Sequence, residues 1–325
     1  MIGIAFAGFR HGHIYSLYEE VKTNNDVTLC GAWEENDAAK SEAKSVGFTY
    51  NSYEELLADK KVQIVAIGDY FGIRGKRIIK ALKAGKNVIT DKPVCTSIEE
   101  LDEIESLLGK TGLKLGCMLD LRFCKFTEPV KKLLSDGTLG EITNVCFTGQ
   151  HPLNYGTRPS WYFENGKHGG TINDIGVHGI DFIAAVSGLR VKKCLAAKEW
   201  NKYATEEPNF MDSAIFMAEL TNGAGVISDV SYSVPNGFGF SLPQYWRFTI
   251  WTTLGMLEFI LGGDKMMVAV KGERNVRHIK CENPPKSNLT DFILELRGGE
   301  CEYDTAFTLK SSRDVLNLQA CTVRD

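Results

Sequence analysis

The sequence predicts an α/β protein of two domains: an N-terminal doubly wound parallel sheet and a C-terminal α/β domain with a large, mostly antiparallel open sheet. Three observations support this. The 325 residues exceed the size at which one hydrophobic core usually stops growing. Short apolar runs alternate with helical patterns as far as residue 120 or so, and long β-type stretches follow Arg122. We therefore expect domains at 1–121 and 122–325, with the last helix free to pack back on the first domain.

The first half opens with a strand, a glycine turn and a helix. The apolar run at 2–7 ends at Gly8, and apolar residues then recur at helical spacing from Ile14 to Val21. Ser52 with Glu55, and Ser97 with Glu100, form capping boxes that begin two later helices. The expected strands that follow are 27–33, 62–67, 87–90 and 113–118, with helical patterns between them. Because these strands are apolar on both faces, they fit a parallel sheet covered by helices on both sides.

The second half has a different pattern. One helix is expected at 127–134, and a helical segment surrounds Asp174 and His178. Asn222 and Gly223 form a hairpin turn between two strands. The expected strands are 142–148, 214–220, 226–232, 246–251, 256–260 and 266–270, and the closing helices are 289–296 and 309–320.

Composition narrows the functional class. The formal net charge is −4 and the basic residues are scattered, which gives no support for nucleic acid or an anionic membrane as a partner. The nine cysteines are odd in number and lack a C-x-x-C pair, so we expect a reducing cytoplasm and no metal site. The N-terminus has no basic leader, and no apolar run approaches 18 residues. We expect a cytoplasmic protein that acts on a small molecule.

The turn after the first strand suggests a dinucleotide site. A G-x-G-x-x-G fingerprint would need glycine at 8, 10 and 13, and only Gly8 fits, so an ordinary strand–helix turn is the alternative. Arg10 and His13 could add positive charge where helix N-terminal amides receive a pyrophosphate. Glu34 ends the second strand, where an acidic residue binds the adenosine ribose, and Glu35 follows it. Two carboxylates would repel a 2′-phosphate, so NAD is favoured over NADP.

Two further features carry chemistry. Asp91, Lys92 and Pro93 follow the fourth strand, at the crevice where parallel sheets bind ligands, although a lone loop lysine is more often simply solvated. Asp174 and His178 stand four residues apart after Gly169 and Gly170, which puts them on one helix face. A carboxylate can orient an imidazole as a base. A surface ion pair or a core histidine is the structural alternative.

Together these segments resemble the Gfo/Idh/MocA family, the glucose-fructose oxidoreductase and inositol dehydrogenase group. The stretch 84–104 is similar to the family's A-G-K-H-V-x-x-E-K-P segment, and 138–142 is similar to its linker into the second domain. The most specific match is 169–181, GGTINDIGVHGID, which resembles G-G-x-x-x-D-x-G-x-H-x-x-D. The resemblance implies a Rossmann domain, a second domain whose open sheet often makes oligomer contacts, and a proline after the lysine that is often cis.

This chain departs from the family pattern at three places. The glutamate before the lysine is Asp91, the glycine turn is degenerate, and the T-P-N-x-x-H segment is replaced by residues 69–74. The expected cofactor-binding residues are Gly8, Phe9, Arg10, His11, Gly12, His13, Glu34, Asp69, Asp91, Lys92 and Pro93.

By the resemblance, Lys92, Asp174 and His178 form the catalytic set of an NAD-dependent dehydrogenase, with NADP less favoured. His178 would take a hydroxyl proton, Asp174 would orient it, and Lys92 would stabilise the developing charge on the oxygen. The substrate would be a sugar, polyol or related hydroxy compound, and a homodimer or homotetramer would form through the second sheet. The alternatives are a glycosidase that uses bound NAD for transient oxidation, and a regulator without turnover.

Substrate contacts are expected from the second domain. The long connection 151–161 combines polar groups with aromatic surfaces, which suits a sugar ring, although each residue there could instead be structural. The expected substrate-binding residues are Arg122, His151, Tyr155, Arg158, Trp161 and Asn173.

Overall fold

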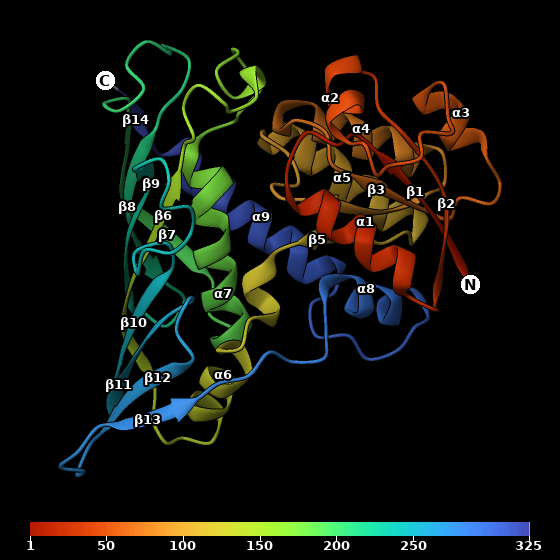
Figure 1. Cartoon of the computed structure of the whole chain (residues 1–325). Coiled ribbons are helices and arrows are strands. Elements are labelled where there is room, and N and C mark those ends of the chain that lie inside the picture. The colour runs from red at the N-terminus through yellow and green to blue at the C-terminus, as the bar shows by residue number, and fades with distance from the viewer. Residues whose placement is uncertain (325) are drawn as a thin grey trace. The chain divides into compact units, whose positions relative to one another are not determined.

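The computed structural model describes residues 1–324 and contains two compact units (Figure 1). The first unit comprises Met1–Leu119, Gly166–Gly169 and Ser287–Arg313. The second comprises Asp120–Asn165, Gly170–Lys286 and the chain from Asp314 onward. The segment that closes the chain is thus divided between the two units. No helix within residues 1–324 is both long enough and apolar enough to cross a membrane.

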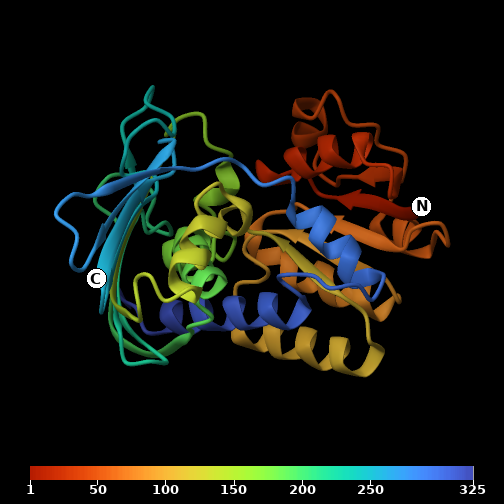
Figure 2. The same ribbon diagram turned by 90° about the horizontal axis from the view of Figure 1, so that it is seen from below.

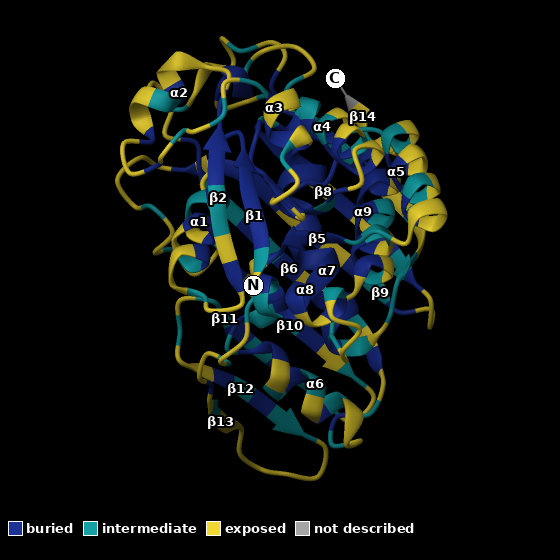
Figure 3. Cartoon of the chain, turned by 90° about the vertical axis from the view of Figure 1, so that its right-hand side faces the viewer, coloured by how far each residue is buried: buried dark blue, intermediate teal, exposed yellow. Residues whose placement is uncertain are grey.

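The first unit contains a five-stranded, fully parallel sheet in the order β2-β1-β3-β4-β5. Its strands are β1 (Ile2–Ala7), β2 (Val27–Trp33), β3 (Ile64–Ile67), β4 (Asn87–Asp91) and β5 (Leu115–Met118). Figure 3 shows the length of β1 as almost wholly buried, as expected for a sheet covered on both faces. The fold class predicted for this half is confirmed.

Helices connect and cover these strands. They are α1 (His13–Thr23), α2 (Asp37–Glu42), α3 (Tyr53–Ala58), α4 (Phe71–Lys83), α5 (Ile98–Thr111) and α8 (Asn288–Leu296), joined by the first part of α9 (Thr305–Ala320). Ser52 and Ser97 cap α3 and α5 by accepting the backbone N–H three residues on, at the two starts that the sequence predicts. All strands are parallel, so the turns after β1, β3 and β4 share one edge of the sheet.

The second unit contains a nine-stranded sheet in the order β13-β12-β11-β10-β6-β9-β8-β7-β14. The strands are β6 (Ile142–Pro152), β7 (Val191–Trp200), β8 (Ser213–Leu220), β9 (Gly225–Val234), β10 (Arg247–Thr252), β11 (Gly255–Ile260), β12 (Lys265–Val270), β13 (Arg277–Lys280) and β14 (Val323–Arg324). Only the β6–β9 and β7–β14 pairs are parallel. The mostly antiparallel open sheet is therefore confirmed, while β7, β13 and β14 were not predicted.

Helices lie along one face of this sheet. The unit contains α6 (Thr127–Ser135), the π-helical turn η3 (Ile172–Gly176) and α7 (Val177–Ser187), together with the short turns η1 (Asp120–Phe123) and η2 (Ser160–Tyr162). Figure 2 shows α6 and α7 along one face of the sheet, and no helix of the described part of the second unit along the other. Between α7 and the strands, Phe182 packs against the stacked rings of Phe248 and Phe259. The uncovered face carries several exposed apolar side chains.

Candidate active site

The turn after β1 is built around Gly8. Gly8 has a φ of +84°, and a Cβ there would lie 2.6 Å from the backbone nitrogen of Asp69. Only glycine therefore allows β1 and the turn after β3 to approach so closely. A Cβ at Gly12, just before α1, would meet nothing within 4 Å, and no side chain caps that helix. The first-glycine position and the N-terminus of α1 thus fit a dinucleotide pyrophosphate.

Glu34 holds this turn in place. Its carboxylate is 1% exposed and accepts hydrogen bonds from the Phe9 N–H at 2.8 Å and the Asn36 N–H at 2.9 Å. Arg10 donates from Nε at 2.9 Å and from Nη2 at 2.8 Å to the same carboxylate. The Arg10 side chain, at the position of the second fingerprint glycine, is therefore directed to Glu34. In this arrangement Glu34 orders the turn, and its predicted contact with the ribose stays a prediction.

Asp69 and Glu35 share a second arginine. Arg77 lies 2.8 Å from a Glu35 oxygen and 3.5 Å from an Asp69 oxygen, and it stacks over the ring of Trp33 at 4.7 Å. Burial, with the negative charge of Glu34 adding to it, raises the pKa of Asp69. Three carboxylates and two guanidiniums thus gather where β2 and β3 end.

Lys92 follows a buried, charged framework at the end of β4. Asp91 is 0% exposed; its burial opposes ionisation, but His11 and Arg74 outweigh that effect and hold its pKa well below the usual range. Arg74 donates to the Asp69 carbonyl at 2.7 Å and to the carbonyl oxygens of Lys92 and Pro93. The Lys92–Pro93 peptide is cis, as the resemblance implies.

The ring of Phe71 lies beside two histidines and Lys92 in the first unit. The rings of His11 and His168 lie 5.2 Å and 5.5 Å from it, and the Lys92 ammonium lies 5.4 Å from its centre. Burial lowers the pKa of His11 to about 4; Asp91 opposes this shift, and the charge of Lys92 adds to it. His11 is therefore neutral near neutral pH.

In the second unit, the segment with Asp174 and His178 is buried. Asp174 lies in the π-helical turn and is 2% exposed, and His178 lies in the first turn of α7 and is 5% exposed. Both residues thus belong to one continuous helical segment, as the sequence predicts. π-Helical turns are rare and are frequent at functional sites.

Two side chains from distant segments hold the start of this turn. Glu199 of β7, fully buried, accepts hydrogen bonds from the Thr171 N–H at 2.7 Å and the Ile172 N–H at 3.3 Å. Gln319 of α9 accepts one from the Asn173 N–H at 3.0 Å. A carboxylate at a helix N-terminus also interacts favourably with the helix dipole. The π-helical turn is therefore fixed at its N-terminal end.

An aromatic group connects His178 with one predicted substrate residue. The ring of Trp246 lies 5.6 Å from that of His178 and 5.5 Å from that of His151. Tyr245 packs against His151 at 5.0 Å. His151 and His178 therefore belong to one aromatic cluster within the second unit.

The other predicted substrate residues have contacts that favour structural roles for several of them. Arg122 makes a bidentate ion pair with Asp181, at 2.8 and 2.9 Å, with both side chains buried. Arg158 donates to the carbonyl oxygens of Leu153 and Pro152, at 2.7 and 2.5 Å.

The three remaining predicted residues differ in exposure. Trp161 is buried and packs on Tyr162. Asn173 is 1% exposed, and its backbone is held by Gln319 as described above. Tyr155 is 37% exposed and donates to Glu207. Of the six, His151 is joined to His178 through the ring of Trp246.

The residues at these two sites that were missed in the sequence include Arg74, His168, Glu199, Trp246 and Gln319. Arg74 stands at the histidine of the family's T-P-N-x-x-H segment, which was the available signal. Trp246 and Gln319 are separated from His178 by long stretches of chain with no motif, so no local pattern could identify them.

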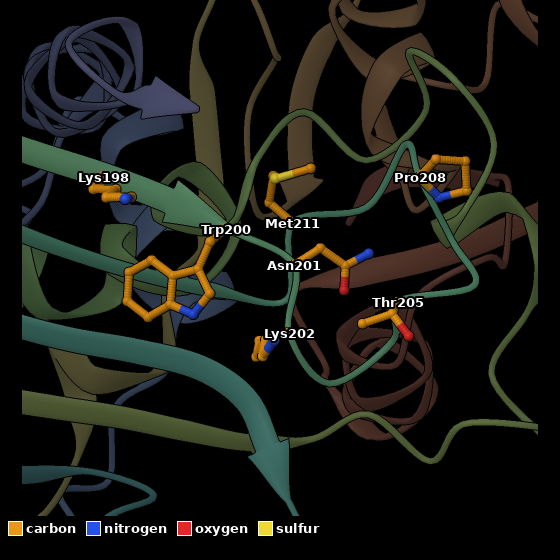
Figure 4. A pocket seen from close by; sticks show the side chains of 7 residues that line it. All are labelled: Lys198, Trp200, Asn201, Lys202, Thr205, Pro208 and Met211. Atoms are coloured by element: carbon orange, nitrogen blue, oxygen red, sulfur yellow. The ribbon is translucent and has the colours of Figure 1, made fainter. Parts of the chain in front are cut away.

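A separate cavity of about 670 Å³ lies at the end of β7 (Figure 4). It is lined by Lys198, Trp200, Asn201, Lys202, Thr205, Pro208 and Met211. None of the predicted site residues lines it, so it does not enter the assignments above.

The chain resembles known proteins over both units. Residues 1–118 match the family described as "Oxidoreductase family, NAD-binding Rossmann fold", and residues 127–258 match the "GFO/IDH/MocA C-terminal domain". A trans-1,2-dihydrobenzene-1,2-diol dehydrogenase of Bos taurus is 26% identical over 57% of this chain and 55% of its own length. A D-xylose dehydrogenase of Paenarthrobacter nicotinovorans is 23% identical over 67% of this chain and 60% of its own length.

The matched part thus covers less than two thirds of either relative. Among solved structures, a putative oxidoreductase from Erwinia carotovora atroseptica has a TM-score of 0.86 at 23% identity, covering 100% of this chain and 99% of its own, which shows a shared fold. Because the two family matches fall in succession on the two sheets, the chain belongs to the GFO/IDH/MocA family of oxidoreductases.

Proposed function

We propose that this protein is an NAD-dependent dehydrogenase that oxidises a secondary alcohol of a sugar, polyol or related hydroxy compound. One observation carries the proposal: a lysine that is 4% exposed follows the last residue of β4, on a loop held by the fully buried Arg74. A buried ammonium fixed at the carboxyl edge of a parallel sheet is suited to binding a substrate oxygen.

The catalytic roles follow from the chemistry of three side chains. His178 accepts the proton of the substrate hydroxyl, and Asp174 orients the imidazole. Lys92 binds the same oxygen and stabilises its negative charge as the proton leaves. A nicotinamide dinucleotide held by the turn after β1 and the N-terminus of α1 would supply the hydride acceptor.

The turn after β1 and the N-terminus of α1 hold the dinucleotide. Gly8 lets the turn after β1 pack closely on Asp69, and the space beside Gly12 is open to the pyrophosphate. Phe9 and Arg10 fix the shape of the turn through their hydrogen bonds to Glu34. Near the ends of β2 and β3, three carboxylates against two guanidiniums leave a local charge of −1. A 2′-phosphate would add negative charge there, so we propose NAD as the cofactor.

The substrate class rests on the aromatic cluster beside His178. Trp246, His151 and Tyr245 combine flat apolar faces with polar edges, which is how proteins bind polyhydroxylated rings. The D-xylose dehydrogenase among the relatives acts on such a compound.

The uncovered face of the nine-stranded sheet is proposed to join copies of this chain. Met217 and Ile227 are cross-strand partners, and Ile227 also faces Cys146 on the next strand. Ile215, Met217 and Ile227 are each nearly half exposed. A row of exposed apolar side chains on a sheet is typical of a protein contact surface.

The proposal is tested with tag-free protein and two dinucleotides. NAD should raise the melting temperature by a few degrees and NADP by less, because a ligand that binds only the native state stabilises it. A panel of pentoses, hexoses and inositols is then screened for NADH absorbance. No stabilisation by either dinucleotide would refute the cofactor assignment. Substrate turnover without net NADH would refute the dehydrogenase and indicate glycoside cleavage by transient oxidation.

A further inference from the structure

Two imidazoles and a carboxylate form a cluster where β1 and β4 end. His11 and His13 come from the turn after β1 and the first residue of α1, and Asp91 ends β4. His11 Nδ1 lies 2.8 Å from Asp91 Oδ2, and His13 Nδ1 lies 3.2 Å from Asp91 Oδ1. One ligand atom from each of the three residues lies within 4.8 Å of the others.

We propose that His11, His13 and Asp91 bind a divalent first-row transition metal ion, with Zn²⁺ as the best match. Imidazole nitrogens and a carboxylate oxygen are ligands that Zn²⁺ takes at about 2.0–2.2 Å, so neighbouring ligand atoms of a tetrahedral ion lie about 3.3 Å apart. The two histidine–aspartate separations, 2.8 and 3.2 Å, are close to that edge, but they involve different oxygens of Asp91. One atom from each residue lies within 4.8 Å of the others, so the side chains would have to move closer together around the ion. The same donor set also suits Co²⁺, Mn²⁺ and Fe²⁺.

The surroundings orient the carboxylate. Arg74, fully buried and anchored on the Asp69 carbonyl, lies 3.6 Å from Asp91 Oδ2. This contact leaves Oδ1 toward His13, and an oriented carboxylate of this kind is typical around metal ligands. The side chains of His11 and His13 are 13% and 26% exposed, so an ion can reach them from solvent.

The neighbouring cations limit the affinity. Arg74 and Lys92 repel a second positive charge next to Asp91, and only one carboxylate offsets them. We therefore expect binding in the micromolar range. Three protein ligands leave a fourth position of a tetrahedral ion for water or an anionic oxygen.

The sequence does not predict this site because its ligands are not local. His11 and Asp91 are 80 residues apart, and the pattern His-Gly-His alone has no metal-ligand spacing. His11, His13 and Asp91 are also among the residues expected to bind the dinucleotide, so the metal site is tested in the protein without cofactor or substrate.

The test titrates tag-free, chelator-treated protein with Co²⁺. We expect visible d–d absorption that saturates at one equivalent and is lost on adding Zn²⁺. His13→Gln, at the most exposed of the three ligands, should weaken Co²⁺ binding at least about tenfold without unfolding the protein. Asp91→Asn should do the same, with circular dichroism to confirm its fold. His278→Gln, an exposed histidine of β13, is the matched control and should bind as the wild type does.

Three results would overturn the metal site. One is the absence of saturable Co²⁺ absorption. Another is unchanged binding by folded His13→Gln. The third is a strong near-ultraviolet charge-transfer band, which would place the ion on thiolates among the nine cysteines. A negative result for NAD binding would leave the Co²⁺ titration unaffected, so the two proposals fail separately.

Discussion

Among single residues, Glu34 has a structural role that the sequence does not reveal. Its position at the end of β2 predicts a ribose contact, but its carboxylate accepts from two backbone N–H groups and Arg10. The place of Glu34 in a Rossmann pattern can be read from the sequence. Its partner cannot, because that partner is Arg10, the side chain that replaces the second glycine of the fingerprint. Arg74 shows the same limit, because its three carbonyl acceptors come from two different turns.

Glu34→Gln should lower the free energy of unfolding by about 1–3 kcal/mol. The side-chain amide of Gln would place its own N–H donors against the backbone N–H groups and Arg10, which now donate to the carboxylate. Glu35→Gln, whose side chain is 45% exposed, should cost less than about 1 kcal/mol. Urea unfolding of both variants measures the difference, and equal costs would contradict the structural role of Glu34.

Asp314 should make stability depend on pH. Burial raises its pKa to about 6 from 3.8, although Arg190 lies 3.7 Å away and opposes the shift. Between these values the folded chain keeps a proton that the unfolded chain releases. The resulting stability is complete below pH 4 and is lost as the pH rises through 6.

The Asn variant removes this dependence. From pH 4 to 7.5, the unfolding free energy of the wild type should fall relative to Asp314→Asn by up to about 3 kcal/mol. Asp264→Asn, at an exposed position, is the control. A constant difference between wild type and Asp314→Asn across this range would show that the carboxyl titrates normally.

At the scale of elements, the long periodic segments were predicted and the irregular ones were not. The strand–helix alternation to β5 follows from apolar runs and capping residues such as Ser97. Strand β7 was missed because two register shifts against β8 break its alternation and exposed lysines interrupt its apolar residues. The π-helical turn was also missed, because 172–176 has the same spacing of apolar residues as an α-helix and is fixed by Glu199 and Gln319.

The contact of α7 with the sheet depends on a glycine. A Cβ at Gly179 would lie 2.2 Å from the ring of Phe147 on β6. Gly179→Ala should therefore lower the melting temperature and cost about 1–3 kcal/mol by overpacking.

Gly109 provides the matched comparison. It lies in helix α5, is exposed, and has nothing within 4 Å of a built Cβ. Gly109→Ala should stabilise the protein by about 0.5–1 kcal/mol, because alanine loses less backbone entropy on folding. Calorimetry of both variants measures the contrast, and stabilisation by both would show that α7 can move away from β6.

For the whole molecule, the fold class was predictable because it follows from patterns that extend over many residues. The oligomer surface proposed above cannot be read from strand alternation alone, since the uncovered face mixes Ile227 with polar neighbours such as Asp229. If that face forms the oligomer, Met217→Lys with Ile227→Lys should reduce the molar mass in light scattering to that of one chain. Val276→Lys, which replaces an apolar side chain 48% exposed elsewhere, should leave it unchanged. An oligomer that survives the double change would contradict the proposed interface.

The central claim is that Lys92 and His178 perform the chemistry on a substrate alcohol. It is tested most directly by initial rates of NADH formation, with a substrate found in the sugar and polyol screen. Lys92→Met and His178→Gln should each reduce kcat at least about 100-fold with the dissociation constant for NAD nearly unchanged, and Lys83→Met, at a side chain 59% exposed, should keep wild-type rates. Near wild-type kcat in either of the first two variants would contradict the account.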